Sequence, residues 1–132
     1  VKDFHYRNFD RRKLQDLAAE CEIFLIADHP HVARLIDVYQ TPDKLSMVTE
    51  LLEGGEVAER VLQRNKFSPS DASNSLYQML LAIKYIHEKN IVHRDIKLEN
   101  FLYEKLDTDH LKLIDFGFSK IFIPNVKMSL SC

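Results

Sequence analysis

Residues 93–100, His-Arg-Asp-Ile-Lys-Leu-Glu-Asn, gather side chains that could bind a metal-bound phosphate and orient a hydroxyl group, and an Asp-Phe-Gly tripeptide follows them. Asp95 could take the proton of an attacking hydroxyl group. Lys97, two positions on in an extended loop, points to the same side and could neutralise charge on a transferred phosphoryl group. Asn100 and Asp115 offer the hard oxygen ligands that magnesium prefers. This pattern predicts phosphoryl transfer from a magnesium-bound nucleotide.

The two motifs, in this order and with an apolar strand pattern between them, resemble the catalytic loop and the metal-binding turn of the protein kinases. The resemblance implies that Asp95 is the catalytic base and that Asn100 and Asp115 hold Mg²⁺ beside ATP. A lysine at the position of Lys97 resembles the serine/threonine kinases. A polar loop followed by a turn at a strand end is the alternative explanation of the same residues.

A predicted ion pair between Lys2 and Glu20 would complete this site. Kinases place a strand lysine on the α- and β-phosphates and hold it with a glutamate of the next helix. Glu20 lies eighteen residues after Lys2 and ten before Pro30, a spacing that resembles this family. Glu22 is the rival partner, but the helix turns it about 200° away from Glu20. A solvated lysine without a partner is the simpler alternative.

The segment from Glu50 to Glu56, Glu-Leu-Leu-Glu-Gly-Gly-Glu, resembles the hinge between the two kinase lobes. The resemblance implies that the main chain of Glu50 and Leu52 binds the adenine edge of ATP, and that Glu56 binds the ribose or a basic substrate residue. Thr49 would limit access behind the adenine, and Leu102 would lie beneath it. A strand that ends in a glycine turn is the alternative.

His93 carries the side chain whose pKa best suits proton transfer near neutral pH. In kinases the corresponding histidine is structural, so the resemblance implies that His93 packs in a column with Phe116, Phe24 and Leu35. This column would link the two lobes. We therefore expect no catalytic role for His93.

Regulation by phosphate is a further expectation from the resemblance. Arg94 has the position that commonly holds a phosphorylated activation segment in kinases, and Lys120 could help it. Ser129 or Ser131 could carry the phosphate, although ordinary loop serines would give the same sequence.

Within the kinases, residues 53–56, 86–95 and 115–120 look most like the calcium/calmodulin-regulated group, especially the calcium-dependent protein kinases of plants and protists. Glu56 and Glu99 would favour a basic residue a few positions before the serine or threonine of a protein substrate. Those kinases carry their calcium-sensing part after the catalytic domain, so such a region is expected outside this chain.

Two other segments superficially resemble metal sites. Residues 107–109, Asp-Thr-Asp, resemble the opening of a calcium loop, but Lys112 occupies the position that needs glycine. Residues 29–31, His-Pro-His, are better explained as a turn. We expect no metal site at either segment.

Apolar periodicity indicates the elements that must position these residues. Their order predicts an α+β chain, which the resemblance makes a bilobal protein-kinase-like fold. We predict helices over 11–27, 56–64 and 70–88, with an N-cap at Asp10 and a helix entry signal at Ser68-Pro69-Ser70. We predict strands over 32–39, 45–51, 101–103 and 111–114, and a loop over 121–132.

The resemblance covers nearly the whole chain and divides it into a small lobe (1–49), a hinge (50–56) and a large lobe (57–132). The glycine-rich loop of the kinases would precede Lys2, and their Ala-Pro-Glu segment would follow Cys132. We therefore expect a partial kinase domain, truncated at both ends. Transfer of the ATP γ-phosphate to protein serine or threonine is expected of a longer parent enzyme rather than of this piece alone.

Bulk properties restrict the alternatives. The 132 residues are 45% hydrophobic and 29% charged, as in an ordinary globular domain, and the net charge of −2 gives no case for nucleic acid or an anionic membrane. Apolar runs of five residues are too short to span a bilayer, and the residues Val1-Lys2-Asp3 do not have the hydrophobic character expected of a signal peptide. Two cysteines are too few for a disulfide framework, so we expect a reducing, cytoplasmic location.

Two other functions remain open. A pseudokinase-like scaffold would bind nucleotide without catalysis, but degenerate kinases usually lose the base, the lysine or the metal acid, and this chain keeps all three. A small-molecule kinase with the same fold is the second alternative. Lys97 and the pair Glu56 and Glu99 argue against it.

Overall fold

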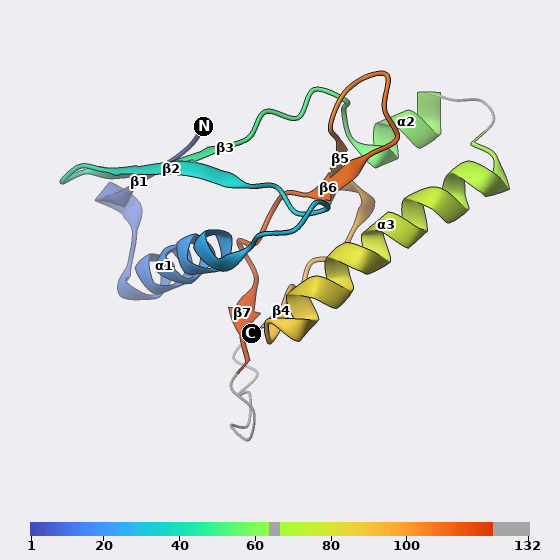
Figure 1. The fold of residues 1–132 in the computed structure, drawn as a ribbon. Helices are drawn as coiled ribbons and strands as arrows, with labels where there is room; N and C mark the ends of the chain where they lie inside the picture. Colours follow the sequence, from blue (N-terminus) through green and yellow to red (C-terminus); the bar gives the residue numbers. More distant parts are fainter. Residues whose placement is uncertain (64–66, 123–132) are drawn as a thin grey trace.

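The computed structural model describes residues 1–63 and 67–122 and forms two halves (Figure 1). In the first, which we call the sheet half, three antiparallel strands lie in the order β1-β3-β2, and helix α1 lies beneath them (Figure 1). A 3₁₀ turn at Tyr6–Asn8 joins β1 to α1. The elements of this half are β1 (Lys2–His5), α1 (Arg11–Ile26), β2 (Leu35–Gln40) and β3 (Lys44–Thr49).

The second part, the helical half, is built on the long helix α3, which runs alongside a small antiparallel ribbon of β5 and β6 (Figure 1). A second antiparallel pair, β4 with β7, lies at the C-terminal end of α3. A 3₁₀ turn at Leu98–Asn100 leads into β5. The elements are α2 (Val57–Gln63), α3 (Pro69–Glu88), β4 (Ile91–Val92), β5 (Phe101–Tyr103), β6 (Leu111–Leu113) and β7 (Lys120–Ile121).

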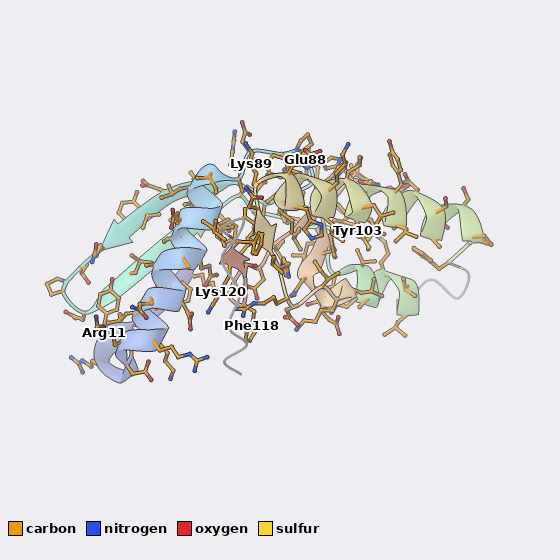
Figure 2. The ribbon with its side chains drawn as sticks, turned by 90° about the horizontal axis from the view of Figure 1, so that it is seen from below. Arg11, Glu88, Lys89, Tyr103, Phe118 and Lys120 are labelled. Atoms are coloured by element: carbon orange, nitrogen blue, oxygen red, sulfur yellow. The ribbon has the colours of Figure 1, made fainter. Side chains whose placement is uncertain are left out.

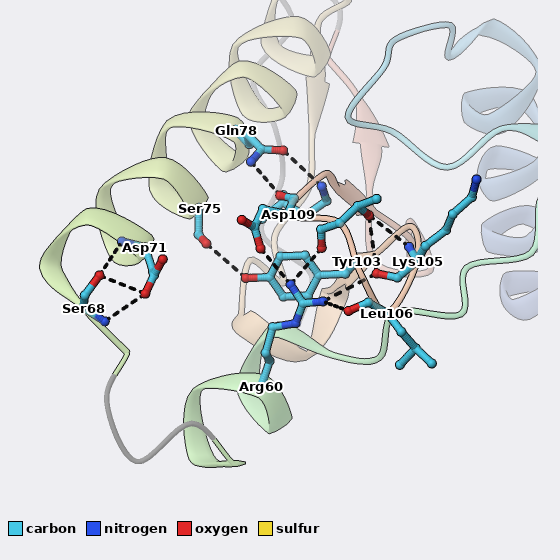
Figure 3. Close-up of polar contacts among 11 residues, drawn as sticks. Arg60, Ser68, Asp71, Ser75, Gln78, Tyr103, Lys105, Leu106 and Asp109 are labelled. Atoms are coloured by element: carbon cyan, nitrogen blue, oxygen red, sulfur yellow. Dashed lines mark hydrogen bonds and ion pairs between the residues drawn. The ribbon is translucent and has the colours of Figure 1, made fainter.

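The two long helices begin where the sequence predicts. The Asp10 carboxylate accepts the N–H of Lys13 at 2.8 Å and caps α1. At α3, Ser68 Oγ accepts the N–H of Asp71 at 3.1 Å, and the Asp71 carboxylate accepts the N–H of Ser68 at 3.1 Å (Figure 3). This reciprocal capping box satisfies two N–H groups that the helix itself leaves unpaired.

The strand boundaries depart from the prediction where tertiary contacts decide them. The first hairpin strand begins at Leu35 rather than at Val32, because Val32 bridges to Leu113 and the N–H of Ala33 donates to Leu113 O at 2.8 Å. These three residues therefore tie the sheet half to β6 before β2 starts. Such a contact between distant segments leaves no local sequence signal.

Three short strands were not predicted. β1 and β4 were not assigned, because two to four residues are too few to show a period. The expectation of a loop over 121–132 is wrong at Ile121, which pairs with Ile91 in the two-stranded β4–β7 sheet. Ser129 and Ser131 lie outside the described residues.

The hydrophobic core crosses between the halves. α1 and β3 supply much of it from the sheet half, and α3, β4, β5, β6 and Phe116 supply much of it from the helical half, so each half is packed against the other. Its fully or nearly fully buried members include Ile23, Phe24, Met47, Ala82, Ile86, Ile91, Phe101, Leu111, Leu113 and Phe116. Among the described residues, no helix is long and apolar enough to cross a membrane.

Arg60 of α2 holds the loop between β5 and β6 (Figure 3). Its guanidinium donates to the carbonyls of Thr108 at 2.8 Å and Leu106 at 2.9 Å, and pairs with the Asp109 carboxylate at 3.0 Å. It also lies 3.7 Å from the ring centre of Tyr103. Oxygens of the loop that superficially resembles a calcium site are thus bound to an arginine, and the absence of calcium there stays a prediction.

Replacing Arg60 with methionine is expected to lower the free energy of unfolding by about 2–4 kcal/mol, because it removes the charge-assisted hydrogen bonds that the buried Arg60 side chain makes to loop carbonyls. Chemical denaturation of the full-length protein measures this. Lys105→Met is the matched control, since the Lys105 side chain is exposed in the same loop. Equal stability of the two variants would contradict the assignment of Arg60 as the anchor of this loop.

Candidate active site

Lys2 joins two acidic side chains from distant parts of the chain. Its Nζ atom lies 2.8 Å from Glu20 Oε1 and 3.4 Å from Asp115 Oδ1. β1 supplies the lysine, and α1 supplies the glutamate. The predicted pair of Lys2 and Glu20 is therefore formed. The contact with Asp115 was not predicted, because nothing in the spacing of residues 2 and 115 indicates it.

Burial and charge differ across this group. The Glu20 side chain is only 5% exposed, whereas that of Lys2 is 50% exposed. Burial lowers the pKa of Lys2, but the hydrogen bond and charge of Glu20, with those of Asp115, outweigh it and raise the pKa above its ordinary value. Lys2 is therefore a fixed positive charge at neutral pH, on the side of the sheet half that faces Asp115.

A second polar cluster forms around Asp95. Lys97 Nζ lies 2.8 Å from Asp95 Oδ2, and Asn100 Nδ2 donates to the main-chain oxygen of Asp95 at 2.7 Å and to Oδ2 at 3.2 Å. The hydrogen bond from Lys97, followed by that from Asn100, lowers the pKa of Asp95. The carboxylate is thus ionised at neutral pH, and a base must be in that state to accept a proton.

Asn100 and Asp115 are brought together by the β5–β6 ribbon. The N–H of Ile114 donates to Asn100 O at 3.0 Å, so the residue before Asp115 is bonded to Asn100 itself. The Asp115 carboxylate accepts the N–H of Gly117 at 3.0 Å and is 36% exposed. The cluster around Lys2 and the cluster around Asp95 are therefore neighbours and do not lie on opposite sides of the molecule.

The donor set of this site suits magnesium. Because the NH₂ group of Asn100 is used by Asp95, its amide oxygen remains available as a ligand. Asp115 adds a partly exposed carboxylate. One or two protein oxygens completed by water and phosphate are the usual environment of Mg²⁺. No cluster of three or more His, Cys, Asp or Glu residues that could hold a metal occurs among residues 1–63 and 67–122, so the protein alone provides no closed metal cage there.

Aromatic rings connect the halves behind the polar groups. Phe116 packs edge-on against Phe24 with ring centres 5.0 Å apart, and its centre lies 5.5 Å from that of His93. All three are buried, and Leu35 packs against the same core. The expected contacts of Phe116 with Phe24 and His93 are therefore present, and the place of Leu35 in the column stays a prediction. His93 Nδ1 accepts the N–H of Asp95 at 3.2 Å, so the ring also fixes the loop that carries Asp95.

The connecting segment, residues 50–56, links the halves beside Leu102. Glu56 forms an antiparallel bridge with Leu102, and the N–H of Gly54 donates to Tyr103 O at 3.0 Å. A Cβ atom on Gly54 would lie 2.4 Å from that of Tyr103, so only glycine permits this approach. Thr49 ends β3, and Leu52 is half-buried two residues after Glu50. The structure therefore places Glu56 beside Leu102 at one edge of β5, and the adenine contacts expected of Thr49, Glu50 and Leu52 stay predictions.

Arg94 and Lys120 lie near the start of the segment that follows Asp115. Arg94 has a left-handed main chain, with φ of 67°, and its Nε donates to Phe118 O at 2.5 Å. Lys120 begins β7, which contacts α1, and Figure 2 shows Phe118 and Lys120 on the side of the helical half that faces this helix. Arg94 is thus bonded to the main chain of this segment. Its expected role with a phosphate stays a prediction.

The fold thus matches the bilobal, kinase-like arrangement that the sequence predicts. The comparisons with known families agree. The family model described as "Protein kinase domain" matches residues 1–132. The chain belongs to the protein kinase domain family.

Individual relatives come from two kinds of kinase. The chain is 40% identical to calcium/calmodulin-dependent protein kinase type IV of Homo sapiens over 114 residues, which are 86% of this chain and 24% of that protein. It is 42% identical to calcium/calmodulin-dependent protein kinase cmkA of Emericella nidulans over 103 residues, 77% of this chain and 25% of that protein. It is 40% identical to putative ribosomal protein S6 kinase alpha-2 of Caenorhabditis elegans over 102 residues, 76% of this chain and 13% of that protein.

The chain thus spans a quarter or less of the length of these relatives. The resemblance to the calcium/calmodulin-regulated group, predicted from the sequence, is confirmed by the first two names. The narrower resemblance to the calcium-dependent kinases of plants and protists stays a prediction.

The protonation of His93 supplies a test of the aromatic column. Burial lowers the pKa of His93, although the main chain and charge of Asp115 act in the opposite direction. The unfolded chain, with a histidine pKa of about 6.5, therefore takes up the proton more readily than the folded protein. The stability that neutral His93 contributes is fully present at pH 7 and above, and it decreases as the pH falls below about 6.5 towards the folded pKa.

We expect the stability advantage of wild type over His93→Phe to shrink as the pH is lowered from 7 to 5. Urea denaturation of both full-length proteins at each pH measures it, and effects of His29 and His31, whose pKa values burial also lowers, cancel in the difference. A difference that stays constant with pH would contradict a neutral, buried His93.

Proposed function

We propose that this chain provides the ATP site of a serine/threonine protein kinase, which transfers the γ-phosphate of ATP to protein substrates. The observation that carries the proposal is the convergence of Lys2, Glu20 and Asp115 with the cluster of Asp95 and Asn100. The sheet half with residues 1–49 would be the small lobe, residues 50–56 the hinge, and residues 57–132 the part of the large lobe that reaches the activation segment.

Asp95 is the proposed catalytic base. Its ionised carboxylate accepts a hydrogen bond from the substrate hydroxyl group and takes its proton as the oxygen attacks phosphorus. Lys97, which lies 2.8 Å from the same carboxylate, neutralises charge on the transferred phosphoryl group. The pair is exposed enough for a protein side chain to approach, because Asp95 is half-buried and Lys97 is exposed.

Lys2 and Glu20 are the proposed phosphate-positioning pair. The carboxylate of Glu20 fixes the ammonium group of Lys2, which then binds the α- and β-phosphates of ATP. Asn100 and Asp115 would hold Mg²⁺, which neutralises phosphate charge when it is bound. Because Lys2 also contacts Asp115, the phosphates and the metal ligands are fixed relative to each other.

The adenine ring is proposed to lie against the connecting segment. The N–H of Glu50 donates to Arg34 O at 2.9 Å, so the carbonyl of Glu50 is the group left to accept the adenine amino group. Leu52 would supply the second main-chain bond. Leu102 would lie beneath the ring, Thr49 would limit the space behind it, and Glu56 would bind the ribose or a basic substrate residue.

Protein substrates with a basic residue before the acceptor are favoured by Glu56 and Glu99, whose charges oppose that of arginine or lysine. Calcium/calmodulin dependence is stated in the names of two relatives. We propose that a calcium-sensing region, if the protein has one, lies outside this chain. Nucleotide binding without transfer is the rival function, and the following experiment separates the two.

Replacing Asp95 with asparagine is expected to lower kcat of the full-length protein by roughly 10²–10⁴-fold, because the base is lost while its shape is kept. Peptide phosphorylation with Mg²⁺ and ATP measures kcat, and the dissociation constant of ATP should change by less than about twofold. Asp37→Asn is the control for an exposed acid of β2. Equal rates for wild type and Asp95→Asn would remove Asp95 from the mechanism, and binding without any transfer by wild type would favour the scaffold.

Replacing Glu20 with glutamine is expected to lower kcat/KM for ATP by about 10- to 100-fold, because the buried partner of Lys2 loses its charge. Steady-state kinetics of the full-length protein at varied ATP measure this. Glu22→Gln on the same helix is the matched control, since Glu22 is exposed. A similar loss in both variants would contradict the specific pairing of Lys2 with Glu20.

A further inference from the structure

Lys112 makes a close ion pair with the first residue of the connecting segment. Its Nζ atom lies 2.8 Å and 2.7 Å from the two carboxylate oxygens of Glu50. The side chains are only 12% and 19% exposed. Lys112 belongs to β6, so this contact ties the connecting segment to the helical half.

Glu50 is tied to the sheet half as well. Its Oε1 atom accepts the N–H of Arg34 at 2.8 Å, and its own N–H donates to Arg34 O at 2.9 Å. Arg34 immediately precedes β2. Lys112 therefore holds the side chain of Glu50, and the main chain of Arg34 holds both the side chain and the main chain of Glu50. The carbonyl of Glu50 has little freedom to move in this arrangement.

The Lys112–Glu50 pair differs from the exposed ion pairs of the protein. Lys84 and Glu88 are 72% and 61% exposed, and exposed pairs of that kind contribute little because water screens them. Loss of Lys112 would leave the half-buried Glu50 carboxylate with the N–H of Arg34 alone. A carboxylate left in that state tends to turn towards water, which would shift the main chain that carries it.

The position of Lys112 on β6 adds a second connection to the nucleotide. Lys112 is paired across the ribbon with Leu102 of β5, and side chains of paired residues lie on the same face. Leu102 is the proposed floor of the adenine site, and Glu50 is its proposed edge. The β5–β6 ribbon thus positions both residues, Leu102 directly and Glu50 through Lys112.

We propose that Lys112 is a positioning residue for ATP, which acts through Glu50 and does not touch the nucleotide. It holds the carbonyl of Glu50 where the adenine amino group must donate. This inference rests on the proposed function and assigns a role to a residue that the sequence analysis used only to exclude calcium. A site whose donors and acceptors are fixed in advance binds its ligand more tightly, because less freedom is lost on binding.

The test is Lys112→Met in the full-length protein. The dissociation constants of ATP and inosine triphosphate are measured by competition with a fluorescent nucleotide. Inosine triphosphate carries an oxygen in place of the amino group and cannot donate to Glu50 O. We expect the dissociation constant of ATP to rise roughly 3- to 10-fold and that of inosine triphosphate to change by less than about twofold. The KM for the peptide substrate should stay constant.

Three variants complete the design. Lys112→Arg, which keeps the charge and can bind a carboxylate with two hydrogen bonds, should restore most of the ATP affinity. Lys84→Met is the matched control on an exposed lysine. Glu50→Gln should weaken ATP binding in the same way, and the double variant with Lys112→Met should lose little further ATP affinity. Should Lys112→Met fail to fold, the Glu50→Gln comparison carries the same expectation.

Unchanged ATP affinity in Lys112→Met would overturn the inference. An equal loss for ATP and inosine triphosphate would also overturn it, because a general loosening of the site does not depend on the amino group. These outcomes leave the proposed function intact. A wild-type protein that binds neither nucleotide would instead overturn the proposed function itself.

Discussion

The buried carboxylate of Glu20 is the constraint on which the site depends. It lies on the core-facing side of α1, 5% exposed, where an ionised carboxylate without a partner is strongly destabilising. Lys2 satisfies it at 2.8 Å, and this requires β1 to lie over α1 in one register. The same ammonium group reaches Asp115 of the helical half. A requirement of folding thus sets the distance between the two halves at the point where phosphate would bind.

Packing elsewhere supports that arrangement. The ring of Phe116, one residue after Asp115, is held between Phe24 and His93, so the acid cannot move without disturbing the core. On the other side of the site, Lys112 and Glu50 connect β6 to the segment between the halves. Apolar contacts and a half-buried ion pair therefore hold the halves at separate points, and both points flank the proposed nucleotide.

Local signals made part of this structure predictable from the sequence. Asp10 fits an N-cap by residue type and position, and the Lys2–Glu20 pair followed from the resemblance to kinases. The anchors Arg60 and Lys112 were missed, because the partners named for them lie 46 to 62 residues away and surface lysines and arginines are common. Two-residue strands were missed for a different reason, since no period can be read from them. The sequence did not indicate that Lys2 meets Asp115 or that Lys112 meets Glu50.

The most direct test of the central claim is paramagnetic broadening of amide signals by Mn²⁺, bound in place of Mg²⁺ with a non-hydrolysable ATP analogue on the full-length protein. The account predicts broadening of the amides of Asp95, Asn100 and Asp115 in the presence of both metal and nucleotide. The loop anchored by Arg60, at the opposite end of β5 from Asn100, should stay sharp. Broadening centred on that loop, or none at all near Asn100 and Asp115, would contradict a single nucleotide and metal site between the halves.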